Sequence, residues 1–244
     1  MKASAAAVVV SVLFAASASA QVADDLSRRQ ALQHFRAGQE LMLAERYEQA
    51  AAEFTDAVGL DPLLTIAHYG RGQAYMALRR YASAVQAFLD CRKAFEQLAR
   101  LHQRNTAEAS RQETDEMYEL RDSIRRMQNQ VSVNAATRNR IEQRLEELQT
   151  LRRNVRPGEP PRVPAALYLS LGSAYFRSGR ADDAEREWRA AVATDNSLGE
   201  AHNNLAALYL TAGRKREAED AIRAAERARF RVDPRLKEEI AKMN

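Results

Sequence analysis

Apolar residues recur at helical spacing in two stretches near the middle of the chain. The first stretch runs through Met117, Leu120, Ile124 and Met127, and the second runs through Ile141, Leu145, Leu148 and Leu151. Gaps of three and four residues are typical of a narrow apolar seam on one face of an α-helix. The preceding residues 103–116 are almost entirely polar, and no glycine or proline between Gln73 and Arg156 forces a helix to end. The pattern predicts a helical insert at 99–156.

The two seams match each other when the chain is folded back near Asn134. Residue 117 then faces 151, 120 faces 148, 124 faces 145 and 127 faces 141, so that the paired numbers add to 268 or 269. Antiparallel pairing requires such mirror symmetry, which predicts a coiled-coil-like helical hairpin within one chain. We expect this hairpin to share little core with the rest of the protein. The alternative is that its helices dimerise with a second molecule.

Outside the insert, the chain repeats itself with a period of 34 residues. The positions related in this way are Gly38 and Gly72, Ala50 and Ala84, Phe54 and Phe88, Tyr175 and Tyr209, Gly179 and Gly213, Ala184 and Ala218, and Ala191 and Ala225. Because small and large residues recur together, we predict two antiparallel helices in each unit, with the small residues where these helices come closest. Gly179 and Gly213 fall where a helix ends in a left-handed turn.

This pattern resembles the tetratricopeptide repeat, a helix–turn–helix unit of 34 residues. Four units can be framed, at 31–64, 65–98, 165–198 and 199–232. The resemblance implies an all-α fold, namely a tetratricopeptide-repeat α-solenoid of two repeat pairs with the antiparallel hairpin inserted between them. The first two units depart from the pattern, because Glu45 and Arg79 replace the turn glycine. Glu96 replaces the closing proline of the second unit, so its second helix need not stop there.

These patterns divide the chain into six parts. They are a signal peptide at 1–20, repeats 1–2 at 21–98, the coiled-coil-like insert at 99–156, a proline-rich linker at 157–164, repeats 3–4 at 165–232, and a capping helix at 233–244. The linker composition predicts a stiff, extended segment. Asp233 and Pro234 form a helix start, and the apolar Leu236 and Ile240 predict a short helix that covers the last repeat.

The N-terminal segment has the pattern of an export signal. Lys2 precedes an apolar stretch from Ala5 to Ala16, and Ala18-Ser19-Ala20 gives the small-x-small motif that signal peptidase accepts. The apolar stretch is too short to span a membrane, which takes about 20 residues. We therefore predict cleavage after Ala20 and a periplasmic or secreted protein whose mature chain has no integral membrane span. The alternative is a cytosolic protein with an apolar N-terminus.

Charge and motifs argue against nucleic-acid binding and against catalysis. The 37 basic residues are interleaved with 33 acidic ones, without a block of like charges. No motif for a metal site, a phosphate loop or an activated nucleophile occurs. His34, His68 and His202 share one repeat position, too far apart for a common metal, and Cys91 falls at a small packing position. We expect no cofactor, no metal and no enzymatic activity.

What remains is the concave groove that the first helices of the repeats are expected to line. Its candidate peptide-binding residues, placed by the repeat frame, are Phe35, Gln39, Tyr69, Gln73, Ser173, Phe176, Asn203 and Asn204. Aromatic and amide side chains suit an extended or helical peptide. Asn203 and Asn204 also resemble the asparagines that hold peptide backbone in some members of the tetratricopeptide-repeat family.

We therefore interpret the chain as an exported, periplasmic scaffold that binds a protein or peptide partner through this groove. The hairpin supplies a second contact surface in this hypothesis. The alternative is an oligomeric structural envelope protein in which the insert forms an intermolecular coiled coil. The mass in solution separates the two hypotheses, because a monomer excludes the second.

Overall fold

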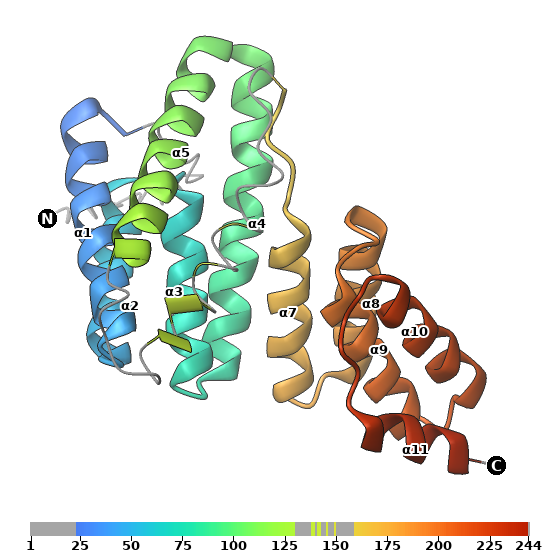
Figure 1. The fold of residues 1–244 in the computed structure, drawn as a ribbon. Coiled ribbons are helices and arrows are strands. Elements are labelled where there is room, and N and C mark those ends of the chain that lie inside the picture. The colour runs from blue at the N-terminus through green and yellow to red at the C-terminus, as the bar shows by residue number, and fades with distance from the viewer. Residues whose placement is uncertain are drawn as a thin grey trace, which may run out of the picture.

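A computed structural model describes residues 23–129 and 159–243, together with 138, 139, 141, 142, 145 and 149 between them. Within this part of the chain every regular element is an α-helix, and the chain runs from α1 at one end of the array to α10 and α11 at the other (Figure 1). The signal peptide predicted at 1–20 lies outside the described residues.

Eight of the described helices form four antiparallel pairs. Their first helices are α1 (Asp25–Leu43), α3 (Thr65–Ala77), α7 (Ala165–Arg177) and α9 (Gly199–Thr211), and their second helices are α2 (Tyr47–Leu60), α4 (Tyr81–Arg104), α8 (Ala181–Thr194) and α10 (Lys215–Arg227). α5 (Thr106–Asn129) follows the second pair, and α11 (Pro234–Lys242) follows the last pair. This arrangement is the all-α solenoid of two repeat pairs that the 34-residue period predicts.

Small residues bring the two helices of a unit into contact, as the repeat pattern predicts. A Cβ atom added at Gly38 would lie 2.7 Å from Cε1 of Phe54, and one added at Gly72 would lie 2.4 Å from Cε1 of Phe88. Both distances are shorter than a real Cβ atom tolerates, so only glycine allows the phenyl ring to sit against the neighbouring helix. The two phenyl rings are completely buried and fill the space between the helices.

The two repeat pairs stack as one continuous array. α7 packs against α4 and α3 (Figure 1). Across this boundary Tyr69 Oη lies 3.0 Å from Ser170 Oγ, and Arg92 of α4 donates a hydrogen bond to Glu187 of α8 at 3.0 Å. Pro164 precedes α7 in an extended conformation. The chain therefore leaves the array after α4 and re-enters it at α7 without interrupting the stack.

All four turns within the units use the left-handed backbone region. Gly179 and Gly213 have φ angles of 79° and 72°, as predicted for these glycines. Glu45 and Arg79 occupy the equivalent turns with φ angles of 58° and 56°. A side chain in this region costs roughly 1–2 kcal/mol relative to the right-handed region. The packing of the two helices in each unit therefore imposes the left-handed turn even where the turn residue is not glycine.

Replacing the exposed Arg79 by glycine is expected to raise the free energy of unfolding by about 0.5–1 kcal/mol, because relief of the left-handed strain exceeds the extra chain entropy of glycine. The reciprocal change Gly213→Arg is expected to lower it by a similar amount. Urea unfolding of both variants checks this pair of predictions, and an equal sign for the two changes would contradict it.

The second helix of the second unit continues beyond the unit, in line with its missing proline. α4 has 24 residues, whereas α2 has 14. The chain breaks only at Asn105, whose side chain accepts a hydrogen bond from the Glu108 backbone N–H at 3.3 Å. Asparagine is a favourable N-cap, so this residue both ends α4 and starts α5.

Only part of the predicted hairpin lies within the described residues. Its first arm is α5. On the predicted second arm, Ile141 is buried and Leu145 is partly buried against the core. Leu148 and Leu151 lie outside the described residues. The antiparallel pairing of the two arms therefore stays a prediction.

α11 forms the predicted capping helix at the C-terminal end. Asp233 accepts a hydrogen bond from the Arg235 backbone N–H at 2.9 Å, and Pro234 occupies the first helical position. Ile240 is buried, and α11 packs against α9 and α10. α11 thereby covers one side of the last described repeat.

Candidate functional site

The four first helices carry all the residues that the sequence predicts to bind a peptide. We call the surface on which these residues were predicted to lie the first-helix face. Its predicted residues are Phe35 and Gln39 on α1, Tyr69 and Gln73 on α3, Ser173 and Phe176 on α7, and Asn203 and Asn204 on α9. The structure divides this face into two halves, because α5, which packs against α4, also contacts α1 and the start of α3 through its side chains (Figure 1).

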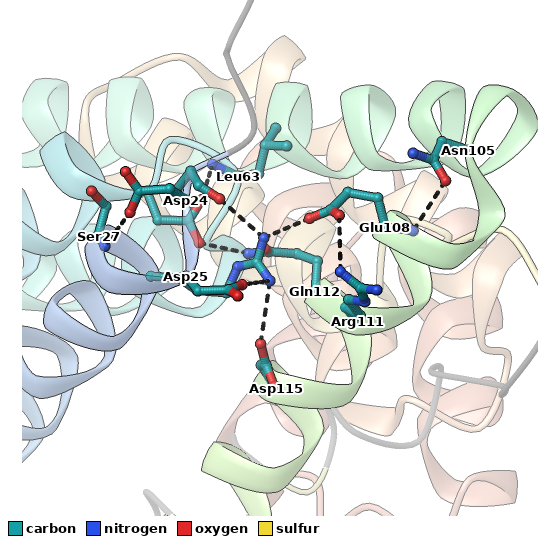
Figure 2. A network of polar contacts seen from close by, with 12 residues as sticks. Asp24, Asp25, Ser27, Leu63, Asn105, Glu108, Arg111, Gln112 and Asp115 are labelled. Carbon is teal, nitrogen blue, oxygen red and sulfur yellow. Dashed lines mark hydrogen bonds and ion pairs between the residues drawn. The ribbon is translucent and has the colours of Figure 1, made fainter.

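Ion pairs join α5 to α1. Arg28 of α1 is almost completely buried, and its guanidinium donates hydrogen bonds to Glu108 at 2.7 Å and to Asp115 at 3.5 Å. Both acceptors lie on α5 and are labelled in Figure 2. Further along α1, Arg36 donates through Nε and Nη2 to a single oxygen of Glu119, at 2.8 and 2.6 Å. The Glu119 side chain is only 2% exposed and forms ion pairs with Arg36 and Arg126.

The middle of α5 is joined to α3 by a buried carboxyl group. Oε1 of Glu116 accepts a hydrogen bond from the Thr65 backbone N–H at 2.8 Å, and Oε2 accepts one from the Thr65 hydroxyl at 2.6 Å. One turn earlier on α5, Gln112 donates to Asp61 at 2.7 Å. Burial, with added repulsion from Asp61, raises the pKa of Glu116 to about 8. Burial also raises the pKa of Asp61.

Apolar residues complete the contact between α5 and the first repeat pair. Leu120, Ile124 and Met127 are buried and belong to the same continuous core as Phe35 and Tyr69. Burying an apolar side chain of this size stabilises a protein by about 1.5–3 kcal/mol. The expectation that the insert shares little core with the repeats is therefore wrong for α5, because one side of this helix is part of the core of the first two units.

Three of the four predicted residues on α1 and α3 are closed off from solvent. Phe35, Gln39 and Tyr69 are buried. Gln73 is half-buried and donates a hydrogen bond to Tyr69 Oη at 2.9 Å. Phe35, Gln39 and Tyr69 are therefore part of the interior and offer no surface to a separate molecule.

The predicted residues on α7 and α9 remain accessible. Phe176 is 40% exposed, and its ring centroid lies 5.5 Å from that of Trp188. Ser173, Asn203 and Asn204 are half-buried. Oδ1 of Asn203 is buried and has no hydrogen-bond partner within the described residues, although the side chain as a whole is half-buried. This half of the first-helix face combines an exposed aromatic ring with amide groups.

Sequence reasoning missed the residues that attach α5, because a polar helix is ordinarily read as a solvated one. The available signal was their spacing: Glu108, Gln112, Glu116 and Glu119 fall at intervals of four, four and three residues, which places them on one helical face. The matching Arg28 lies about eighty positions earlier in the chain, and such a long-range pairing leaves no periodic pattern.

The histidine and cysteine side chains that could bind a metal or react have structural roles. His68 Nε2 lies 3.0 Å from the Pro62 carbonyl, which ties the α2–α3 loop to α3. Cys91 is buried, its Sγ donates to the Thr65 carbonyl at 3.3 Å, and burial raises the pKa of the thiol. Among the described residues there is no group of three or more side chains suited to hold a metal ion. No described helix combines the length and the apolar character needed to cross a bilayer.

Paired helices, glycine–aromatic contacts and shared left-handed turns define this protein as a helical-repeat solenoid. The sequence model of the tetratricopeptide repeat matches residues 35–99 and 169–231, which is more than half of the chain. The chain belongs to the tetratricopeptide-repeat family. Membership in this family supports a scaffold for protein–protein interaction.

Several solved structures resemble the chain in their repeat fold. PilW, described as a widely conserved type IV pilus biogenesis factor, has 17% identity, with 91% of this chain and 87% of that chain covered and a TM-score of 0.41. TTC0263, described as a thermophilic TPR protein in Thermus thermophilus, has 20% identity, coverage of 87% and 98%, and a TM-score of 0.35. YrrB, described as a TPR protein with an unusual peptide-binding site, has 18% identity, coverage of 87% and 92%, and a TM-score of 0.31. These likenesses carry nothing about function. No curated protein matches this chain in sequence.

Proposed function

We propose that this protein is an exported scaffold that binds a segment of another protein on the α7–α9 half of the first-helix face, and that it acts by binding and not by catalysis. The observation that carries the proposal is the contrast between the two halves. α5 packs over α1 and α3, whereas Phe176, Asn203 and Asn204 remain accessible on α7 and α9. An exposed ring offers apolar contact to a peptide, and the amides offer hydrogen bonds to its backbone.

A double substitution of Asn203 and Asn204 by alanine tests this surface. Loss of one or two hydrogen bonds of about 1 kcal/mol each predicts roughly a tenfold drop in affinity for a partner captured from the envelope fraction. The melting temperature should barely change, because both side chains are half-exposed. Gln86→Ala on the exposed surface of α4 is the matched control and should bind normally. Unaltered affinity of the double variant would contradict the proposed site.

Export is the second part of the proposal, and it is supported by the signal-like pattern of residues 1–20. The secreted protein is expected to begin at Gln21, after the Ala18-Ser19-Ala20 motif. N-terminal sequencing of the protein from the periplasmic fraction decides the matter. An intact Met1 on the mature protein would refute export by cleavage at this site.

The alternative of an oligomeric structural protein requires the α5 seam to be free for a second chain. Leu120, Ile124 and Met127 are instead buried within one chain, which favours a monomer. Light scattering coupled to gel filtration should therefore give a mass no greater than the 27.4 kDa of the full chain. A mass of twice that value, lost upon changing Ile124 to aspartate, would favour the oligomer.

A further inference from the structure

The proposed function uses α7 and α9 and leaves the other half of the first-helix face without a role. We propose that α5 is a releasable intramolecular ligand of the first repeat pair, and that it docks with the buried Glu116 carboxyl in its protonated form. Release of α5 as the pH rises exposes a second binding surface, one suited to an acidic amphipathic helix.

α5 has the form of a helical ligand. Its inner side presents acidic and amide groups in its first half, and Leu120, Ile124 and Met127 in its second half. Its outer side carries exposed polar and aromatic residues, namely Arg111, Tyr118, Arg121 and Arg125. A helix with one apolar and acidic side is the kind of segment that lies along a complementary surface of another helical protein. The surface that α1 and α3 offer to it is complementary in charge through Arg28 and Arg36.

α5 can leave this surface without breaking a backbone ladder. It starts with its own N-cap, Asn105, and its described hydrogen bonds to α1 and α3 all use side chains of α5. On the other side, Thr65 is the first residue of α3, and its backbone N–H is one of those that a helix leaves unpaired. Glu116 therefore acts as an added cap for α3, and water can replace it when α5 is released.

The surroundings of Glu116 favour a neutral carboxyl. The titratable groups around this site are Arg28 of α1, Asp61 of the α2–α3 loop, Arg71 of α3, Asp90, Cys91 and His102 of α4, and Glu113, Asp115 and Glu119 of α5. Within the described residues Glu116 forms no ion pair. The hydrogen bonds that it accepts from Thr65 favour its charged form, but complete burial and the neighbouring Asp61 outweigh them. Arg28 directs its own hydrogen bonds to other acceptors. Asp61 adds a second buried carboxyl beside Glu116.

Release therefore depends on pH in a defined direction. The pKa of Glu116 is about 8 when α5 is docked, against an ordinary value of 4.5 when the side chain is in water. The contribution of the protonated Glu116 to docking is therefore fully present below about pH 4.5 and is lost as the pH rises through 8. Between pH 5.5 and 7.5 the equilibrium for release of α5 should rise roughly 50- to 100-fold. The raised pKa of Asp61 acts in the same direction.

Hydrogen exchange of the full chain, followed by mass spectrometry at pH 5.5 and 7.5 and corrected for the intrinsic exchange rate, tests the proposal. Amides of α5 should lose protection by the stated factor, while those of α9 should keep theirs. Glu116→Gln, which cannot ionise, should remove this pH dependence. Asp122→Asn is the matched control, because Asp122 is an exposed carboxyl on the same helix, and it should behave like the unchanged protein.

Three results would overturn the proposal. They are pH-independent protection of α5 in the unchanged protein, an unchanged pH dependence in Glu116→Gln, and loss of α5 protection only together with that of α2 and α4. The first and the third are read on the unchanged protein, so the test stands even if the Glu116 variant fails to fold. A labelled peptide of residues 106–129 should also bind the full chain more tightly at pH 7.5 than its Glu119→Arg variant. Equal binding of the two peptides would contradict the proposed preference for an acidic helix.

Discussion

Replacing Phe88 by alanine is expected to lower the free energy of unfolding by about 3–5 kcal/mol, a large fraction of the stability of an ordinary domain. The ring is completely buried between α3 and α4, its centroid lies 5.6 Å from that of Tyr69, and it sits directly against Gly72. Because Gly72 has no side chain to move into the vacated space, the cavity cannot collapse easily. The loss should therefore lie near the upper end of this range.

Chemical unfolding by urea measures this change, and Tyr118→Ala provides its control. Tyr118 is an aromatic residue that is 63% exposed on the outer side of α5, so its truncation should alter the free energy of unfolding by no more than about 0.5 kcal/mol. Equal losses in the two variants would mean that the glycine–phenyl contact does not hold the second unit together. Circular dichroism should show that both variants are helical before denaturant is added.

Changing Ile124 to aspartate is expected to detach α5 from the first repeat pair. Ile124 is 7% exposed within the core that α5 shares with α1 and α3, so the change removes apolar burial and places a carboxylate in an apolar site. The docking free energy of α5 should fall by at least about 3 kcal/mol. From the sequence alone, both repeat pairs would be expected to stay unaffected; the structure predicts that the first pair loses stability and the second pair keeps it.

Limited digestion with trypsin measures the detachment, because α5 carries the exposed Arg121 and Arg125. A loss of about 3 kcal/mol corresponds to more than a hundredfold rise in the released population, and cleavage should follow that population. Gln128→Asp adds the same charge at an exposed position of the same helix and should leave the rate of cleavage nearly unchanged. Slow cleavage in both variants would show that α5 stays docked through its ion pairs alone.

The sequence by itself determined the repeat architecture. Glycine and phenylalanine at a period of 34 specify where two helices touch. The ring of Phe88 occupies the space that a Cβ atom at position 72 would need, so the contact requires glycine there. The same reasoning predicted the left-handed turns at Gly179 and Gly213 and the start of α11 at Asp233. These features depend on neighbours within one unit, and local spacing records them.

Only the tertiary structure decided which half of the first-helix face is open. Phe35 and Asn203 occupy related helices of the repeat frame, yet one is buried and the other is accessible. The difference comes from α5, whose attachment relies on Arg28, Glu116 and Glu119 rather than on an apolar stripe alone. A polar residue in a sequence indicates a solvated surface unless its partner is known. Here the partner lies far away in the sequence and comes close only when the chain folds. No local period in the sequence therefore indicates it.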